Sequence, residues 1–111
     1  MSDLSEFQEQ AKHLREQIEL KNQTEALLLD PKFTKIILKG FCEDEMQRNM
    51  GLAVCETVTP DIRELCNNLA KASAALNNYL NTIITMGRYA EEALEEVETT
   101  IQELQMKEDA E

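Results

Sequence analysis

Turn-forming and aromatic residues are scarce in this sequence. Its 111 residues include three glycines, two prolines, no tryptophan and only 5% aromatic residues. So few turn residues favour a small number of long helices over a many-stranded sheet. Hydrophobic residues still make up 42% of the chain, which is normal for a folded domain, so the core has to be largely aliphatic. We therefore predict an all-α protein that forms a single helical domain over residues 1–111.

Residue patterns that support catalysis or metal binding are also missing. Cys42, Cys55 and Cys66 form no closely spaced pair, and the single histidine, His13, is distant from them in sequence. Zinc sites and disulfide frameworks need paired or clustered ligands, so neither is predicted. There is no glycine-rich phosphate loop and no nucleophile with a recognisable base. The sequence predicts no enzyme activity, no catalytic, cofactor-binding or metal-binding residues, and no cofactor.

Long apolar runs are absent too. No stretch approaches the ~18 apolar residues of a membrane-spanning helix. The acidic residues Asp3, Glu6 and Glu9 near the start of the chain do not fit a signal peptide. We expect a cytoplasmic protein without a membrane partner.

Two proline signals divide the chain. In Asp30-Pro31 and in Thr59-Pro60, a capping residue precedes a proline that suits the first position of a helix. Gly40 stands where a left-handed residue would end a short helix. The expected helices span about 3–29, 31–39, 43–55 and 60–107.

The last predicted helix carries the most regular pattern. From Ile62 to Leu104, apolar or small residues recur at alternating steps of four and three without a slip. Such a 3.5-residue repeat is typical of a left-handed coiled-coil seam. Ser73, Gly87 and Ala90 on this seam are small and allow a neighbouring backbone to approach closely. The seam residues predicted to form a protein interface are Leu69, Leu76, Leu80, Ile83, Leu94, Val97, Ile101 and Leu104.

The apolar face of this helix is wide up to Ala93 and narrow beyond it. We predict that the N-terminal helices cover the first part, and that the last part projects and pairs with another copy or another protein. The alternative is that the first helix folds back along the whole seam. That first helix has its own apolar stripe from Leu4 to Ile18, which breaks at Lys21 and Glu25.

Negative charge gathers at one end of the chain. The formal net charge is −11, and residues 91–111 hold nine acids against one base, a net of −8. Phosphate binding needs a basic face, so direct nucleic-acid binding is not predicted. The acidic surface outside the seam is either a solvated helix face or a docking site for a basic partner. Its residues are Glu91, Glu92, Glu95, Glu96, Glu98 and Glu103.

One combination of segments resembles a known group of proteins. The stretch from Leu29 to Phe33, the pair Gly40-Phe41 and the later helix through Leu80 resemble small helical proteins encoded among the structural genes of tailed bacteriophages. The resemblance covers roughly residues 27–104. It implies a virion or assembly context, in the host cytoplasm or in the particle, and no active site.

Two functions follow as hypotheses. The first is a non-enzymatic structural, assembly or adaptor protein that acts through helix–helix contacts. Its partner would be itself, as a homo-oligomer, or another virion or assembly protein with a basic surface. The alternative is an acidic inhibitor that mimics DNA and blocks a host nuclease or a restriction or defence protein. The net charge of −11 motivates this alternative, and the concentration of charge at one end counts against it.

Overall fold

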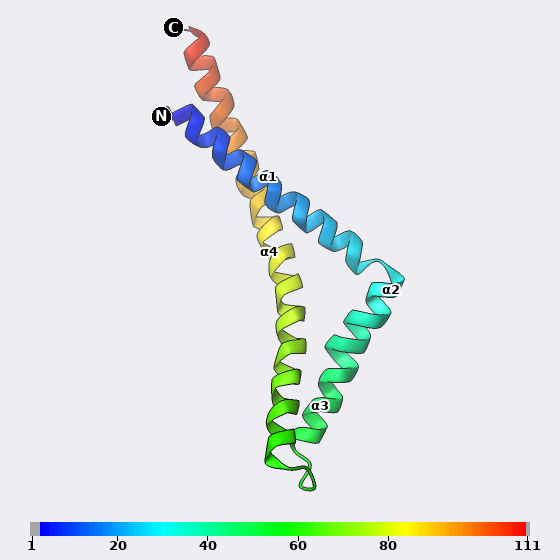
Figure 1. The fold of residues 1–111 in the computed structure, drawn as a ribbon. Coiled ribbons are helices and arrows are strands. Elements are labelled where there is room, and N and C mark those ends of the chain that lie inside the picture. The colour runs from blue at the N-terminus through cyan, green and yellow to red at the C-terminus, as the bar shows by residue number, and fades with distance from the viewer. Residues whose placement is uncertain (1–2, 111) are drawn as a thin grey trace. The chain divides into compact units, whose positions relative to one another are not determined.

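The computed structural model describes residues 3–110, which fold into helices joined by short turns, with no strand among them (Figure 1). The elements in chain order are α1 (Asp3–Leu28), α2 (Pro31–Phe33), η1 (Thr34–Glu45), α3 (Met46–Ala53) and α4 (Pro60–Ala110). The long helix α4 packs against the shorter N-terminal helices. The predicted all-α fold class is confirmed.

The chain divides into two compact units that share α4. Unit 1 combines Met1–Glu25 with Ile83–Glu111, and unit 2 is Ala26–Thr82. The division falls inside α1 and inside the 51-residue helix α4, not in a linker. The single domain over residues 1–111 therefore stays a prediction.

A capped turn precedes α2 in unit 2. The Oδ1 atom of Asp30 accepts hydrogen bonds from the backbone N–H groups of Lys32, at 2.8 Å, and Phe33, at 3.2 Å. Thr34 Oγ1 donates to the Leu28 carbonyl oxygen at 2.9 Å, across the turn. With Pro31 at the first helical position, this cap satisfies the free N–H groups of the new helix. The restart of the helix at this proline agrees with the sequence signal, as does the start of α4 at Pro60.

The helix does not stop at Gly40. α2, η1 and α3 follow one another without a break from Pro31 to Ala53, and no glycine in the described part of the chain has a positive φ. The predicted break between residues 39 and 43, with Gly40 as a left-handed cap, is therefore wrong. The 12 residues of η1 form a π-helix, whose hydrogen bonds reach back five residues. A Cβ atom at Gly40 would lie 3.2 Å from the carbonyl oxygen of Lys35, five residues earlier.

The buried core is thin. The largest side chain exposed by less than 2% among the described residues is that of Ser73. Leu80 and Val97 are the large aliphatic residues that the fold buries, each 7% exposed. The buried polar groups of Thr24, Asn49 and Ser73 donate hydrogen bonds to the carbonyl oxygen four residues earlier, at 2.8, 2.8 and 3.2 Å. The helices thus bury narrow strips rather than a wide apolar interior.

Candidate interaction surfaces

In unit 1, α1 packs along the distal part of α4. Ala11 is fully buried on α1, and Ala90 and Val97 are 2% and 7% exposed on α4. Arg15 Nη2 forms an ion pair with Glu98 Oε1 at 3.2 Å. The prediction that the last part of α4 projects without a partner in the same chain is therefore wrong. The apolar stripe of α1 needs only a narrow seam opposite it, and the distal part of α4 supplies one.

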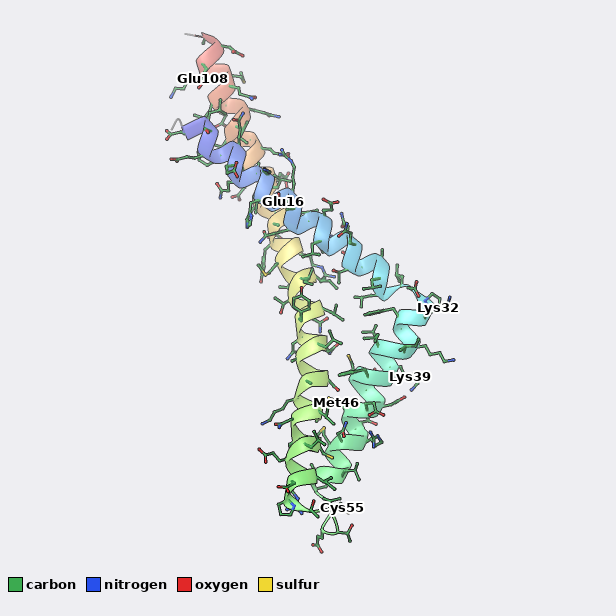
Figure 2. The ribbon with its side chains drawn as sticks, in the orientation of Figure 1. Glu16, Lys32, Lys39, Met46, Cys55 and Glu108 are labelled. Carbon is green, nitrogen blue, oxygen red and sulfur yellow. The ribbon has the colours of Figure 1, made fainter. Side chains whose placement is uncertain are left out.

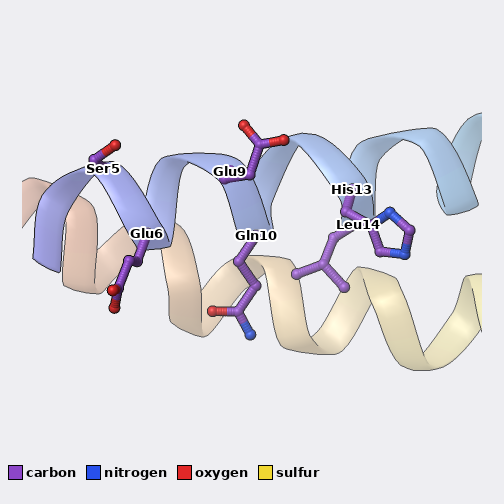
Figure 3. Close-up of a pocket in the computed structure, with 6 residues that line it drawn as sticks. All are labelled: Ser5, Glu6, Glu9, Gln10, His13 and Leu14. Atoms are coloured by element: carbon purple, nitrogen blue, oxygen red, sulfur yellow. The ribbon is translucent and has the colours of Figure 1, made fainter. Parts of the chain in front are cut away.

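Near the start of α1, the helix also runs beside α4 (Figure 3). Glu6, Gln10 and Leu14 point toward the neighbouring α4, whereas Ser5 and Glu9 point away from it. These five residues, together with His13, line a surface hollow. All six belong to one helix, so the hollow does not gather polar groups from several elements around a ligand.

A lysine occupies the seam between α1 and α4. The side chain of Lys21 is only 11% exposed, and its Nζ pairs with Glu25 Oε1 at 3.1 Å and with Glu91 Oε1. The hydrogen bond to Glu91, followed by the one to Glu25, raises the pKa of Lys21 above its usual value. A Cβ atom at Gly87 would lie 2.6 Å from Lys21 Cγ and 2.8 Å from Cδ, and closer still to Cβ. Gly87 therefore provides the space that the stem of Lys21 fills.

The predicted seam residues differ in burial. Leu80 and Val97 are buried within the chain, and Leu69 is 42% exposed. The half-buried members are Leu76, Ile83, Leu94, Ile101 and Leu104. Their role as an interface between chains stays a prediction.

The six glutamates of the acidic surface are also not equivalent. Glu91 and Glu98 form ion pairs with α1 inside unit 1. The exposed members are Glu92, Glu95, Glu96 and Glu103. Over whole units, the charge is strongly segregated: unit 1 holds 15 acids and 5 bases, a net of −10, and unit 2 holds 7 acids and 6 bases, a net of −1.

Exposed apolar residues show the opposite distribution. Of the thirteen large hydrophobic residues exposed in the described part of the chain, nine belong to unit 2. These nine are Leu27, Leu29, Ile36, Met50, Val54, Ile62, Leu65, Leu69 and Tyr79. A contiguous exposed apolar surface is typical of a protein interaction site, so it matters which of these residues share one helix face.

Two adjacent rows on α4 account for four of these nine residues. Cys66, Ser73 and Leu80 recur every seven residues and are 4%, 1% and 7% exposed. This row is covered within unit 2, where α3 lies beside the first turns of α4 (Figure 1). The neighbouring row, which we call the open stripe, follows steps of three and four and is exposed except for half-buried Leu76. It consists of Ile62, Leu65, Leu69, Ala72, Leu76 and Tyr79.

The turn between α3 and α4 holds the most accessible thiol (Figure 2). Cys55 Sγ lies 3.1 Å from Thr57 Oγ1, and its carbonyl oxygen accepts a hydrogen bond from Arg63 Nη2 at 3.2 Å. Hydrogen bonds from Thr57, and then the charge of Arg63, lower the pKa of the Cys55 thiol. Burial instead raises the pKa of Cys42.

Within residues 3–110, no group of three or more His, Cys, Asp or Glu side chains is arranged to hold a metal ion. None of the helices described is both long and apolar enough to cross a membrane. Comparison with protein-family models, curated proteins and solved structures finds no match for this chain.

Proposed function

We propose that this chain is a non-catalytic assembly or adaptor protein that acts through helix–helix contacts. The observation that carries the proposal is the open stripe beside a covered row on the same helix. On α4 of unit 2, one row is buried within the chain and a neighbouring apolar row remains exposed to water. Burial of that strip contributes free energy roughly in proportion to its apolar area, about 25 cal/mol per Å² before the cost of association is subtracted.

The context that we propose is the assembly or the particle of a tailed bacteriophage. The resemblance of residues 27–104 to small helical proteins from phage structural gene clusters supports it. Unit 1, with its net charge of −10, suits a second contact with a basic surface of another assembly protein. Such a contact would weaken as the salt concentration rises.

The charge of unit 1 also supports a second candidate, an inhibitor that mimics DNA. Two of its glutamates, Glu91 and Glu98, are engaged by cations of the same chain, which reduces the charge free for a DNA-binding enzyme. A nuclease assay in host extract tests this candidate. Protection of DNA by the protein would favour it over the assembly function.

The assembly function is tested by absolute mass and by affinity capture from the native host. The expected result is a defined multimer, or a stoichiometric complex with a helical partner that survives purification. A protein that stays a monomer at 12.7 kDa and captures no stoichiometric partner would contradict the proposal.

A further inference from the structure

We infer that a second copy of this chain docks antiparallel along the open stripe of α4. This inference rests on the proposed function and adds the identity of the partner, the surface and the orientation. The stripe extends from Ile62 to Tyr79, which is about 26 Å of helix at 1.5 Å per residue. Its repeat of three and four is the one that lets two helices remain in contact along their length.

Charge selects the partner. Two copies that meet through unit 2 bring together units of net charge −1, whereas a contact through unit 1 would bring together two units of net charge −10. A strongly basic partner would find little to attract it along the open stripe. In a two-fold symmetric contact, the same surface of both copies must pack against itself. A near-neutral apolar surface can do so without bringing like charges together.

The residues that border the stripe support the same partner. On one side lies the covered row of Cys66, Ser73 and Leu80. On the free side, positions 61, 68, 75 and 82 hold Asp61, Asn68, Ala75 and Thr82, all exposed. Three of these four are uncharged, so a second helix can approach without burying unpaired charges. The amide of Asn68 can exchange its bonds to water for bonds across the contact.

Side-chain size selects the orientation. A two-fold axis between Leu69 and Ala72 places Leu69 of each copy opposite Ala72 of the other. The outer layers then pair Leu65 with Leu76 and Ile62 with Tyr79, so that every layer holds at least one large residue. A parallel pairing would set Ala72 against Ala72 and leave a gap, which interfaces packed like protein interiors avoid. Parallel pairing would also continue along α4 into residues 83–110, where both copies carry the glutamates of the acidic surface.

The first test is light scattering of the full chain over a wide range of concentration. The expected mass is twice 12.7 kDa for the wild type. Leu69→Asp buries a carboxylate of each copy beside the two-fold axis, so association should weaken by about a hundredfold or more. Leu69 is 42% exposed in the single chain, so helicity measured by circular dichroism should be retained. Met106→Asp adds the same charge at a residue of unit 1 that is 71% exposed and should leave the dimer intact.

Orientation is tested by disulfide crosslinking in a Cys55→Ser background, since Cys42 and Cys66 are buried. In the antiparallel dimer, Leu65→Cys combined with Leu76→Cys should crosslink two copies, and Leu65→Cys alone should not. Efficient crosslinking by Leu65→Cys alone would overturn the antiparallel arrangement.

The two proposals fail in different ways. A wild-type monomer that captures a stoichiometric partner would overturn the self-association and retain the assembly function. A dimer that tolerates Leu69→Asp would overturn the open stripe as its surface and also retain the assembly function. Only a monomer without any partner contradicts both.

Discussion

Gly87 of α4 lies directly against the aliphatic stem of Lys21 of α1. The absence of a side chain at Gly87 allows a lysine to occupy a seam position, where its stem packs and its ammonium group reaches Glu25 and Glu91. Long cationic side chains commonly bury their methylene groups while the charge stays near water. The contact therefore accounts for two residues that interrupt the apolar patterns of their helices.

Gly87→Ala should destabilise the protein. Alanine favours a helix over glycine by about 1 kcal/mol. At this position, however, its Cβ atom would overlap Lys21 Cβ, which is fixed by the α1 backbone and cannot rotate away. We expect a net loss of about 1–3 kcal/mol in the free energy of unfolding, measured by urea denaturation.

Gly51→Ala is the matched control. No atom lies within 4 Å of a Cβ placed there, so only the helix propensity should act. The expected change is a gain of about 0.5–1 kcal/mol. If both alanine variants gained stability equally, the close contact between Gly87 and Lys21 would be contradicted.

Lys21→Glu should make stability strongly dependent on pH. It would place three carboxylates together, with Glu25 and Glu91, so stability should be low at neutral pH and recover toward about pH 4, where carboxylates protonate. In the wild type the pKa of Lys21 is raised. Its contribution is therefore lost in alkali only above the ordinary lysine value of 10.5, and it also requires the carboxylates of Glu25 and Glu91 to be ionised.

Lys21→Met is the control for this experiment, because it keeps an unbranched stem against Gly87 and removes the charge. In thermal unfolding from pH 4 to 9, the stability of this variant should vary with pH far less than that of Lys21→Glu. A similar pH profile for the two variants would show that the ion pairs at Lys21 do not form.

Cys55 should react first among the three cysteines. Its pKa is lowered and its side chain is half-buried, so it offers more accessible thiolate than buried Cys42, whose pKa is raised. Iodoacetamide labelling followed by peptide mass spectrometry at neutral pH should modify Cys55 before Cys42 and Cys66. Thr57→Val should slow the labelling of Cys55, because it removes the hydrogen bond that favours the thiolate. Equal labelling of all three native thiols would contradict this assignment.

Leu80→Ala should lower stability without acting at the open stripe. Leu80 is 7% exposed in the covered row, and such truncations cost about 2–3 kcal/mol. Leu29→Ala, at a residue that is 82% exposed and outside the stripe, should change the free energy of unfolding by less than about 0.5 kcal/mol. Equal effects of the two truncations would mean that the covered row is not part of the core.

The sequence predicts the features of this fold that local chemistry decides. Asp30 and Pro31 start a helix because a carboxylate cap and a fixed backbone angle act within one turn. Gly40 misleads because glycine is compatible with both a left-handed cap and a π-helical turn, and the residues after it continue the helix. The alternatives for the seam depended on which helix lies opposite it, which is a long-range property.

The candidate surfaces, too, could be predicted from the sequence only where local patterns decide them. The repeat from Ile62 to Leu104 is visible in the sequence, but one continuous seam does not reveal that row Cys66, Ser73, Leu80 is covered and Leu69 is not. The break at Lys21 in the apolar stripe of α1 and the small residue Gly87 in α4 are each visible in the sequence. Their pairing depends on the register between α1 and α4, which no local pattern specifies.

The uneven charge of the two units makes the choice of contact surface a function of acidity. At neutral pH the net charge of −10 disfavours a contact between identical copies through unit 1, whereas unit 2, which carries the open stripe, has a net charge of only −1. Near the isoelectric point of about 4.5 the carboxylates lose much of this charge, so the repulsion between copies of unit 1 fades while the open stripe is almost unaffected. In the proposed dimer, the charge of unit 1 therefore disfavours a competing contact only while its carboxylates are ionised.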